Sequence, residues 1–147
     1  MSKITFVIPC YRSEKTISTV ILEIQNTMSS PANTLNYDYE IILINDCSPD
    51  NVWNVIKEFV LSDKKIIGIN LSRNFGQHSA LMAGYNKASG DIIVTLDDDG
   101  QTPSDEVFKL IDKLNEGFDV VYGGYTQRKD STFRKFGTYV NNLMSEK

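Results

Sequence analysis

Short runs of consecutive apolar residues alternate along the chain with segments in which apolar residues recur every three or four positions. The runs predict buried strands, because a strand covered on both faces needs few polar positions. The spaced segments predict amphipathic helices. The predicted strands are Lys3–Pro9, Tyr39–Asn45, Lys65–Leu71, Asp91–Leu96 and Phe118–Tyr122. The predicted helices are Glu14–Ser30, a helix starting at Ser48-Pro49-Asp50, His78–Ser89, a helix starting at Thr102-Pro103-Ser104-Asp105 and closed by Gly117, and Thr132 to the end of the chain.

Strands that alternate with helices indicate an α/β domain with a mainly parallel sheet. Right-handed crossovers favour the strand order 3-2-1-4, and ligands bind at the carboxyl ends of the strands, between strands one and four. The segment Pro9–Tyr11 ends the first strand, and Asp97–Asp99 follows the fourth. We therefore expect these two segments to meet at a ligand site. Small residues such as Gly84 should let the helix His78–Ser89 lie close to the sheet.

Three consecutive carboxylates, Asp97, Asp98 and Asp99, end the fourth apolar run. On an extended chain alternate side chains point the same way, so Asp97 and Asp99 can face one point, with Asp98 turned away. Gln101 can add a carbonyl oxygen. Such hard oxygen ligands suit Mg²⁺ or Mn²⁺, and a small ligand set leaves positions for phosphate oxygens. A solvated acidic turn is the alternative, although three adjacent like charges repel one another.

Composition and charge narrow the function classes. The chain has 147 residues, 41% of them hydrophobic and 23% charged, which fits one globular domain. Its net charge of −4 argues against nucleic-acid binding. Residues 126–147 carry a net charge of +3, which indicates either an anionic partner or a solvated helix face. Cys10 and Cys47 do not have the spacing of a metal site, and they indicate reduced thiols in a cytosolic setting. We recognise no signal peptide and no apolar run long enough to span a membrane.

Several nucleotide-site motifs are absent from the sequence. No GxGxxG follows the first strand, which disfavours a dinucleotide-binding enzyme. The sequence also lacks GxxxxGK[ST], which disfavours a P-loop enzyme. The segment Asp97–Gly100 resembles the DxDG start of haloacid-dehalogenase-type phosphatases, in which the first Asp is a nucleophile. That motif normally lies on the first strand of its domain, whereas here it follows the fourth.

Four blocks together carry a more specific resemblance. The blocks are VIPCY at 7–11, INDCSPD at 44–50, LSRNFGQHSALMAG at 71–84 and DDDGQTP at 97–103, continued by Arg128 and by DSTFRK at 130–135. They resemble the inverting family-2 glycosyltransferases of GT-A fold, whose core is a Rossmann-like sheet. The greatest similarity is to the enzymes that transfer sugars to polyprenyl phosphate, such as undecaprenyl-phosphate glucosyl- and aminoarabinosyl-transferases and dolichol-phosphate mannose synthase.

The resemblance implies a role for each matching position. Pro9 and Tyr11 would frame the nucleobase, and Asp46 would accept a hydrogen bond from the base edge. The implied donor-binding residues are Pro9, Tyr11, Glu14, Asp46, Arg73, Asp97 and Asp98. The implied ligands of a Mg²⁺ or Mn²⁺ ion are Asp97, Asp99 and Gln101. The residues implied to contact the acceptor phosphate are Arg128, Arg134 and Lys135.

Each role has a simpler alternative. Tyr11 could be a rim aromatic of the core, Asp46 could cap the helix that follows it, and Arg73 could be solvated. Arg134 and Lys135 could be surface charge, and His78 fits a helix-start hydrogen-bonding residue better than a base. The sequence also departs from the family pattern, which usually has a second acid at Asn45, Asn-Glu at Arg12-Ser13 and DADLQ at 97–101. These departures leave the donor identity open.

The resemblance implies metal-dependent transfer of a sugar from a nucleotide diphosphate donor, uridine-based in this interpretation, to a polyprenyl phosphate at the cytoplasmic face of a membrane. We expect residues 1–147 to form a single donor-binding domain, with the catalytic base and the membrane-associated helices beyond residue 147. The chain alone would then bind the donor without transferring sugar, and a non-catalytic nucleotide-sugar-binding module remains the alternative. The apolar side of the final helix, formed by Phe133, Phe136, Val140 and Met144, predicts self-association.

Overall fold

A computed structural model describes residues 2–101 and 104–123, with a four-stranded parallel sheet at their centre. The strands are β1 (Lys3–Cys10), β2 (Asp38–Asn45), β3 (Ile66–Asn70) and β4 (Ile92–Thr95). Their order is β3-β2-β1-β4, and every pairing is parallel. The predicted α/β class, strand order and switch point between β1 and β4 are therefore confirmed.

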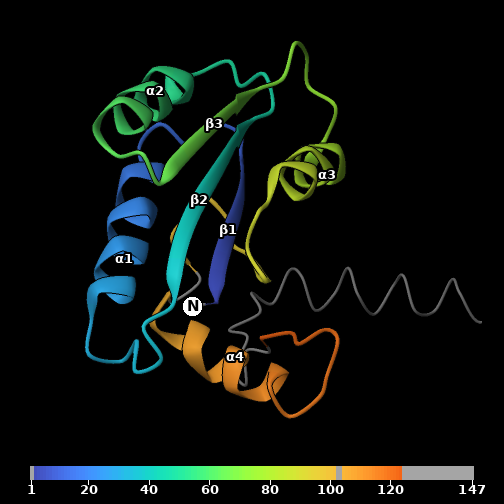
Figure 1. The fold of residues 1–147 in the computed structure, drawn as a ribbon. Coiled ribbons are helices and arrows are strands. Elements are labelled where there is room, and N and C mark those ends of the chain that lie inside the picture. Colours follow the sequence, from blue (N-terminus) through green and yellow to red (C-terminus); the bar gives the residue numbers. More distant parts are fainter. Residues whose placement is uncertain (1, 102–103, 124–147) are drawn as a thin grey trace, which may run out of the picture.

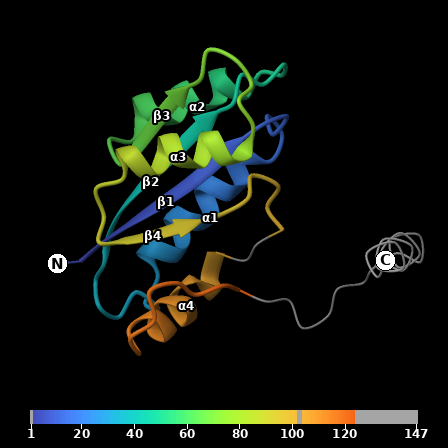
Figure 2. The ribbon, with the colours of Figure 1, turned by 90° about the vertical axis from the view of Figure 1, so that its right-hand side faces the viewer.

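Helices cover both faces of the sheet (Figure 1). Helices α1 (Ile17–Ser29) and α2 (Val52–Ser62) lie on one face, and α3 (Gln77–Lys87) lies on the other. Helix α4 (Val107–Leu114), which follows the short 3₁₀ turn η1 (Ser104–Glu106), lies near the end of the sheet where β1 begins (Figures 1 and 2). None of the helices within these described residues has the length and apolar character needed to cross a bilayer.

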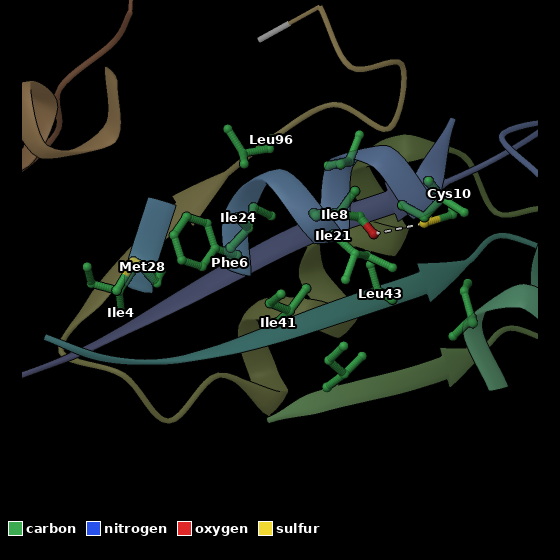
Figure 3. Packing of buried hydrophobic residues seen from close by; sticks show 14 of the residues in the cluster. Ile4, Phe6, Ile8, Cys10, Ile21, Ile24, Met28, Ile41, Leu43 and Leu96 are labelled. Carbon is green, nitrogen blue, oxygen red and sulfur yellow. Dashed lines mark hydrogen bonds between the residues drawn. The ribbon is translucent and has the colours of Figure 1, made fainter. Parts of the chain in front are cut away.

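The larger core fills the space between the sheet and α1 (Figure 3). Alternate β1 residues enter it, since side chains on a strand point to opposite faces in turn. Phe6 lies fully buried there beside Ile24 of α1 and Ile41 of β2. The smaller core on the opposite face holds Val7 with residues of β2 and Ala80 of α3. The two cores explain why the β1 and β2 runs have almost no polar positions.

Helix α3 approaches the sheet at Gly84, as predicted from its small residues. A Cβ atom placed on Gly84 would lie 2.4 Å from Val7 Cγ1 and 2.9 Å from Ile44 Cδ1. Both distances are far below a van der Waals contact, so the position accepts no larger side chain without movement of the helix.

The sheet opens at the carboxyl end of β4. Strand β4 pairs with β1 only over Ile4–Val7, and the last ladder bond runs from the Leu96 amide to the Val7 carbonyl at 3.2 Å. Strand β1 continues beside β2 to Cys10. The β1–β4 ladder therefore ends at Val7, three residues before β1 itself ends, as expected at a topological switch point.

Some predicted element bounds are wrong. The segment Phe118–Tyr122 is not a strand, and Phe118, Val120 and Tyr122 are each more than half exposed. Within the described residues no strand pairs with this segment, and an apolar run needs such a partner to form a ladder. Helix α2 begins at Val52 rather than at Ser48, because the side chains of Ser48 and Asp50 are engaged by the loop after β1.

The end of the sheet opposite the switch point holds a buried carboxylate. Glu40 of β2 is 6% exposed and accepts hydrogen bonds from Lys3 Nζ at 2.5 Å, Thr5 Oγ1 at 2.7 Å and the Ser89 amide at 2.7 Å. Burial by itself would raise the pKa of Glu40, but these hydrogen bonds outweigh it and lower the pKa to about 2. The ionised carboxylate thus joins β1, β2 and the turn that leads into β4.

Candidate functional site

A cavity of about 360 Å³ lies at the carboxyl ends of the strands, where β1 and β4 separate. It is the place that the sheet topology predicts for a ligand. Its lining residues are Pro9, Cys10, Tyr11, Asp46, Asn74, Gly76, Gln77, Asp97, Asp98 and Asp99. Residues from the loops after all four strands thus meet around one space. Of the proposed donor and metal residues, Pro9, Tyr11, Asp46 and the three aspartates lie together here.

The acidic segment is a turn and not an extended strand end. Strand β4 stops at Thr95, and residues 98 and 99 form the turn before Gly100, whose φ is +71°. The expected alternation of side chains therefore does not apply, and Asp98 lines the cavity together with Asp97 and Asp99. The Gln101 amide donates to Asp99 Oδ1 at 2.9 Å, which fixes the end of the turn.

Asp98 also contacts the loop after β1. Its Oδ2 accepts a hydrogen bond from the Tyr11 amide at 2.9 Å, and its carbonyl oxygen accepts one from Thr16 Oγ1 at 2.6 Å. Tyr11 itself lines the cavity and is 43% exposed, and the guanidinium carbon of Arg12 lies 5.4 Å from its ring centre. The acidic turn and the tyrosine therefore form one connected wall.

Asp46 is the most deeply buried carboxylate of the cavity, at 4% exposure. Its Oδ1 accepts the Phe75 amide at 2.7 Å, and its Oδ2 accepts the Gly76 amide at 2.9 Å. The carboxylate thus fixes the loop before α3. It does not cap α2, where the amide of Val52 instead approaches Asp50 Oδ1 at 3.3 Å. The helix-cap alternative for Asp46 is wrong.

Sequence reasoning assigned no role to three polar or glycine residues of the cavity, Asn74, Gly76 and Gln77. Gly76 has φ +86° and ψ 160°, a conformation that essentially only glycine adopts. This conformation presents its amide to both Asp46 Oδ2 and Asn74 Oδ1, the latter at 3.1 Å. The loop itself belongs to the block 71–84, and its glycine, between the end of β3 and the start of α3, is the sequence signal for this role.

Arg73 and Glu14 are not among the lining residues. The guanidinium carbon of Arg73 lies 4.6 Å from the ring centre of Phe75, which does not line the cavity either. Glu14 Oε2 accepts the Asn51 amide at 2.8 Å, and Asp50 Oδ2 accepts the Glu14 amide at 2.9 Å. Glu14 therefore connects the loops after β1 and β2, both of which contribute residues to the cavity.

The same two loops are joined a second time. The Arg12 amide donates to Ser48 Oγ at 2.7 Å, and Ser48 Oγ donates to Asp50 Oδ1 at 2.6 Å. Partial burial acts to raise the pKa of Asp50, but the hydrogen bonds from Ser48 and from backbone amides lower it overall. Arg12 has φ +60°, in the left-handed region. These hydrogen bonds hold this strained conformation next to Tyr11.

Two further positions explain features of the sequence. Asn45 occupies a position at which the resemblance implies an acid. Its side-chain amide donates to Asn70 Oδ1 at 2.7 Å, and its Oδ1 accepts the backbone amide of Ser48 at 3.0 Å. The buried Cys10 donates its thiol to the Ile8 carbonyl at 3.4 Å (Figure 3). Burial, and next the charge of Asp98, raise the pKa of Cys10, which therefore stays a neutral thiol.

The donor chemistry of the acidic turn suits a divalent cation, since Asp97 and Asp99 offer hard carboxylate oxygens beside an open cavity. Within residues 2–101 and 104–123, no three His, Cys, Asp or Glu side chains are gathered into a complete metal site. An ion bound here would therefore take much of its coordination from phosphate oxygens and water. The predicted acceptor residues Arg128, Arg134 and Lys135, and the predicted final helix, lie outside the described residues.

Comparison with known proteins bears directly on this site. The model of the Glycosyl transferase family 2 domain matches residues 5–146. The undecaprenyl-phosphate 4-deoxy-4-formamido-L-arabinose transferase of Proteus mirabilis (strain HI4320) is 39% identical over the whole chain, and that of Yersinia pestis (strain Pestoides F) is 38% identical. The chain spans 44% of the length of each of these relatives.

Solved structures of low sequence identity share the fold. S. aureus TarS 1-349 in complex with UDP superposes with a TM-score of 0.63 at 16% identity, over 87% of this chain and 40% of that one. The mannosyltransferase PcManGT from Pyrobaculum calidifontis, in complex with GDP-Man and Mn²⁺, gives a TM-score of 0.60 at 17% identity, over 73% of this chain and 30% of that one. These matches leave the phosphatase interpretation without support. The chain belongs to glycosyl transferase family 2 and has the GT-A fold.

Proposed function

We propose that this chain is the donor-binding part of a metal-dependent inverting glycosyltransferase. The enzyme would move a sugar from a uridine diphosphate donor to a polyprenyl phosphate. One observation carries the proposal: Tyr11, Asp46 and the Asp97–Asp99 turn line a single cavity at the switch point of the sheet. The 39% identity to a transferase that acts with undecaprenyl phosphate supports the choice of acceptor.

Each part of the cavity suits one part of such a donor. The exposed ring of Tyr11 beside Pro9 offers a surface for the nucleobase, and the fixed carboxylate of Asp46 offers an acceptor for an N–H of the base edge. Asp97 and Asp99, with Gln101 at the end of the turn, would hold Mg²⁺ or Mn²⁺. The bound cation would neutralise charge on the leaving diphosphate.

The reaction itself is a displacement at the anomeric carbon. An acceptor oxygen forms a bond to C1 from one face while the bond from C1 to the diphosphate oxygen breaks on the other. The protein must hold the acceptor in line for this step, and a base must be present wherever a proton is to be removed. We propose that Arg128, Arg134 and Lys135 bind the acceptor phosphate, and that the catalytic base belongs to the part of the relatives that this chain does not span.

A non-catalytic nucleotide-sugar-binding domain is the second candidate. The observation that favours it is the coverage, since the chain spans less than half of the length of its relatives. In both cases residues 1–147 would act as one domain, at the cytoplasmic face of a membrane in the full enzyme. Self-association through the apolar side of the segment 132–147 would be detected as a dimer in solution.

A ligand panel tests donor binding. The purified chain is heated with UDP, CDP or GDP sugars, with and without Mn²⁺, and its midpoint of unfolding is measured. We expect stabilisation by a uridine diphosphate sugar that depends on Mn²⁺, without release of phosphate. Lack of stabilisation by every nucleotide would contradict the proposal.

A transfer assay separates the two candidates. The chain, and a longer version that continues as the relatives do, each receive a nucleotide sugar, Mn²⁺ and a detergent-dispersed polyprenyl phosphate. We expect glycolipid from the longer version alone. Glycolipid formed at similar rates by both would show that residues 1–147 already contain the complete catalytic machinery.

A further inference from the structure

The two walls of the cavity are joined through Asp98, and the role inferred for this residue rests on the function proposed above. Tyr11 belongs to the loop after β1, where the nucleobase would bind, and Asp97 and Asp99 belong to the turn after β4, where the cation would bind. Asp98 Oδ2 accepts the Tyr11 amide at 2.9 Å, and the Asp98 carbonyl accepts Thr16 Oγ1 at 2.6 Å. Side chain and backbone of one residue thus contact the base-side loop.

These contacts lie beyond the end of the β1–β4 ladder. The last ladder bond joins the Leu96 amide to the Val7 carbonyl, and the strands separate after it. From that point on, the hydrogen bonds of Asp98 connect the turn to the loop. A change in the position of the turn would therefore be transmitted to the backbone of Tyr11.

A divalent cation would act on this connection through charge. Adjacent carboxylates repel one another, so the charges of Asp97, Asp98 and Asp99 oppose the hydrogen bonds that hold the turn. A cation held by Asp97 and Asp99 would relieve that repulsion and fix the residue between them. Fixing Asp98 would in turn fix the amide of Tyr11 and hence the surface offered to the base.

We propose that Asp98 is a positioning residue that couples cation binding to nucleobase binding through its hydrogen bond with the Tyr11 amide. Thermodynamic linkage makes such coupling reciprocal, so the cation tightens the nucleoside and the nucleoside tightens the cation by the same factor. The coupling needs no direct contact between the two ligands. It differs from the bridging by phosphate oxygens that any metal–diphosphate site has.

The test uses uridine, which has no phosphate to contact the cation. The affinity of the chain for Mn²⁺ is measured with and without saturating uridine. We expect uridine to tighten Mn²⁺ binding by about fivefold, near the lower end of measured couplings between sites. An unchanged Mn²⁺ affinity, in a chain that does bind both Mn²⁺ and UDP, would overturn the coupling and leave the proposed function intact. A chain that does not bind UDP in the presence of Mn²⁺ would instead overturn the proposed function, and the coupling with it.

Three variants locate the coupling. Asp98→Ala removes the acceptor of the Tyr11 amide, and the ratio of the two Mn²⁺ affinities should fall to about one. Asp98→Asn keeps a side-chain oxygen for that amide, so most of the ratio should remain although Mn²⁺ itself binds more weakly. Asp91→Ala is the matched control. Asp91 Oδ2 accepts the Lys3 amide at 2.9 Å and so joins β1 to β4 at the end of the sheet away from the cavity.

The ratio in Asp91→Ala should equal that of the wild type. The assignment to Asp98 would be overturned if uridine tightened Mn²⁺ binding in Asp98→Ala as much as in the wild type. It would also be overturned if uridine no longer tightened Mn²⁺ binding in Asp91→Ala. Should Asp98→Ala fail to fold, the test is an NMR titration of the wild type with Mg²⁺ that follows the amide resonance of Tyr11. Saturating Mg²⁺ should shift that resonance together with those of Asp97 and Asp99. A Tyr11 resonance that stays in place while the other two move would overturn the proposal.

Discussion

The carboxylate of Asp46 and the amide of Gly76 lie 2.9 Å apart, although β3 separates them in the sequence. The second carboxylate oxygen accepts the neighbouring Phe75 amide at 2.7 Å. A buried carboxylate with two amide donors is held in one orientation, because rotation would break both hydrogen bonds. The orientation of the group proposed to bind the base is therefore set by the loop before α3.

Replacing Asp46 with alanine should weaken nucleotide binding and leave Mn²⁺ binding intact. The variant would lose the proposed charge-assisted hydrogen bond to the base, and such a bond is worth about 1.5–3 kcal/mol, or roughly ten- to a hundredfold in affinity. Titration calorimetry with UDP and separately with Mn²⁺ measures both. The free energy of unfolding should also fall by about 1–3 kcal/mol, because two buried amides lose their acceptor.

Asp63→Ala is the control for Asp46→Ala. Asp63 also accepts hydrogen bonds on both carboxylate oxygens, from the Lys65 amide and the Gln25 side chain, but it does not line the cavity. This variant should lose stability and keep its affinity for UDP. If Asp46→Ala behaved in the same way, the role of Asp46 would be confined to holding the loop.

Alanine at Gly76 should lower nucleotide affinity through the backbone alone. A Cβ atom on Gly76 would meet no heavy atom within 4 Å, so no clash arises, but φ +86° is strained for any residue with a side chain. Such strain costs about 1–3 kcal/mol and favours a rearranged loop that no longer holds Asp46. Calorimetry with UDP and thermal unfolding measure the two effects.

Gly117→Ala provides the comparison for Gly76→Ala. Gly117 has φ +106° and equally open surroundings, but it follows α4 and lies outside the cavity lining. It should lose a similar amount of stability with no change in UDP affinity. Equal losses of affinity in both variants would show that general destabilisation, and not the loop, controls binding.

Alanine at Asp99 should abolish the dependence of nucleotide binding on Mn²⁺ without unfolding the domain. Asp99 lines the cavity and is exposed, and its hydrogen bond from the Gln101 amide stays within the turn, so little stability depends on it. The measurement is UDP affinity with and without Mn²⁺, with circular dichroism as the check on folding. Unchanged metal dependence would remove Asp99 from the ligand set.

The layout of the sheet followed from the sequence because it depends on pattern alone. Uninterrupted apolar runs at β1 and β2 and helical spacing at α1 were enough to give the order β3-β2-β1-β4, and hence a site near Tyr11 and Asp97. Gly84 was likewise informative, since its lack of a side chain is needed at one close contact. These features depend on local periodicity and on the handedness of crossovers, which the sequence contains.

Details that depend on contacts between distant parts of the chain could not be predicted from the sequence. Phe118–Tyr122 has the composition of a strand but no neighbour among the described strands, so it remains exposed coil. Asp98 was expected to point away because the strand was expected to continue, whereas β4 ends at Thr95 and its side chain reaches the Tyr11 amide. Asn74 and Gly76 line the cavity from a loop whose amides bond to Asp46, a partner that is distant in the sequence.

Alanine at Gly84 should destabilise the domain through overpacking. Its Cβ atom would lie 2.4 Å from Val7 Cγ1, so α3 or the contacting side chains must shift, at a cost of about 1–3 kcal/mol. Urea unfolding measures the loss. Val7→Ala removes the clashing methyl group, and the double variant should be more stable than the sum of the single losses predicts. Additive losses would show that the contact with Val7 is not the cause.

Acid should destabilise the domain in part through the Glu40 network. The folded state holds the pKa of Glu40 at about 2, below the ordinary value of 4.5, so its contribution to stability is complete above pH 4.5. Between pH 4.5 and 2 the unfolded chain takes up the proton first, and the contribution is lost as pH falls. The shift corresponds to roughly 3 kcal/mol in the free energy of unfolding.

Other carboxylates titrate over the same range, so the informative quantity is the difference between the wild type and Glu40→Gln. The amide of this variant keeps the shape of the side chain but carries no charge for Lys3 Nζ, which lies 2.5 Å from Glu40 Oε2. Urea unfolding at pH 7 should show a less stable variant, and the difference from wild type should shrink steadily as pH falls from 4.5 to 2. Asp38→Asn is the control, because the Asp38–Lys65 pair at 2.6 Å is about half exposed on both sides and should contribute little. Parallel pH profiles for wild type and Glu40→Gln would mean that the Glu40 carboxylate is not preferentially ionised in the folded state.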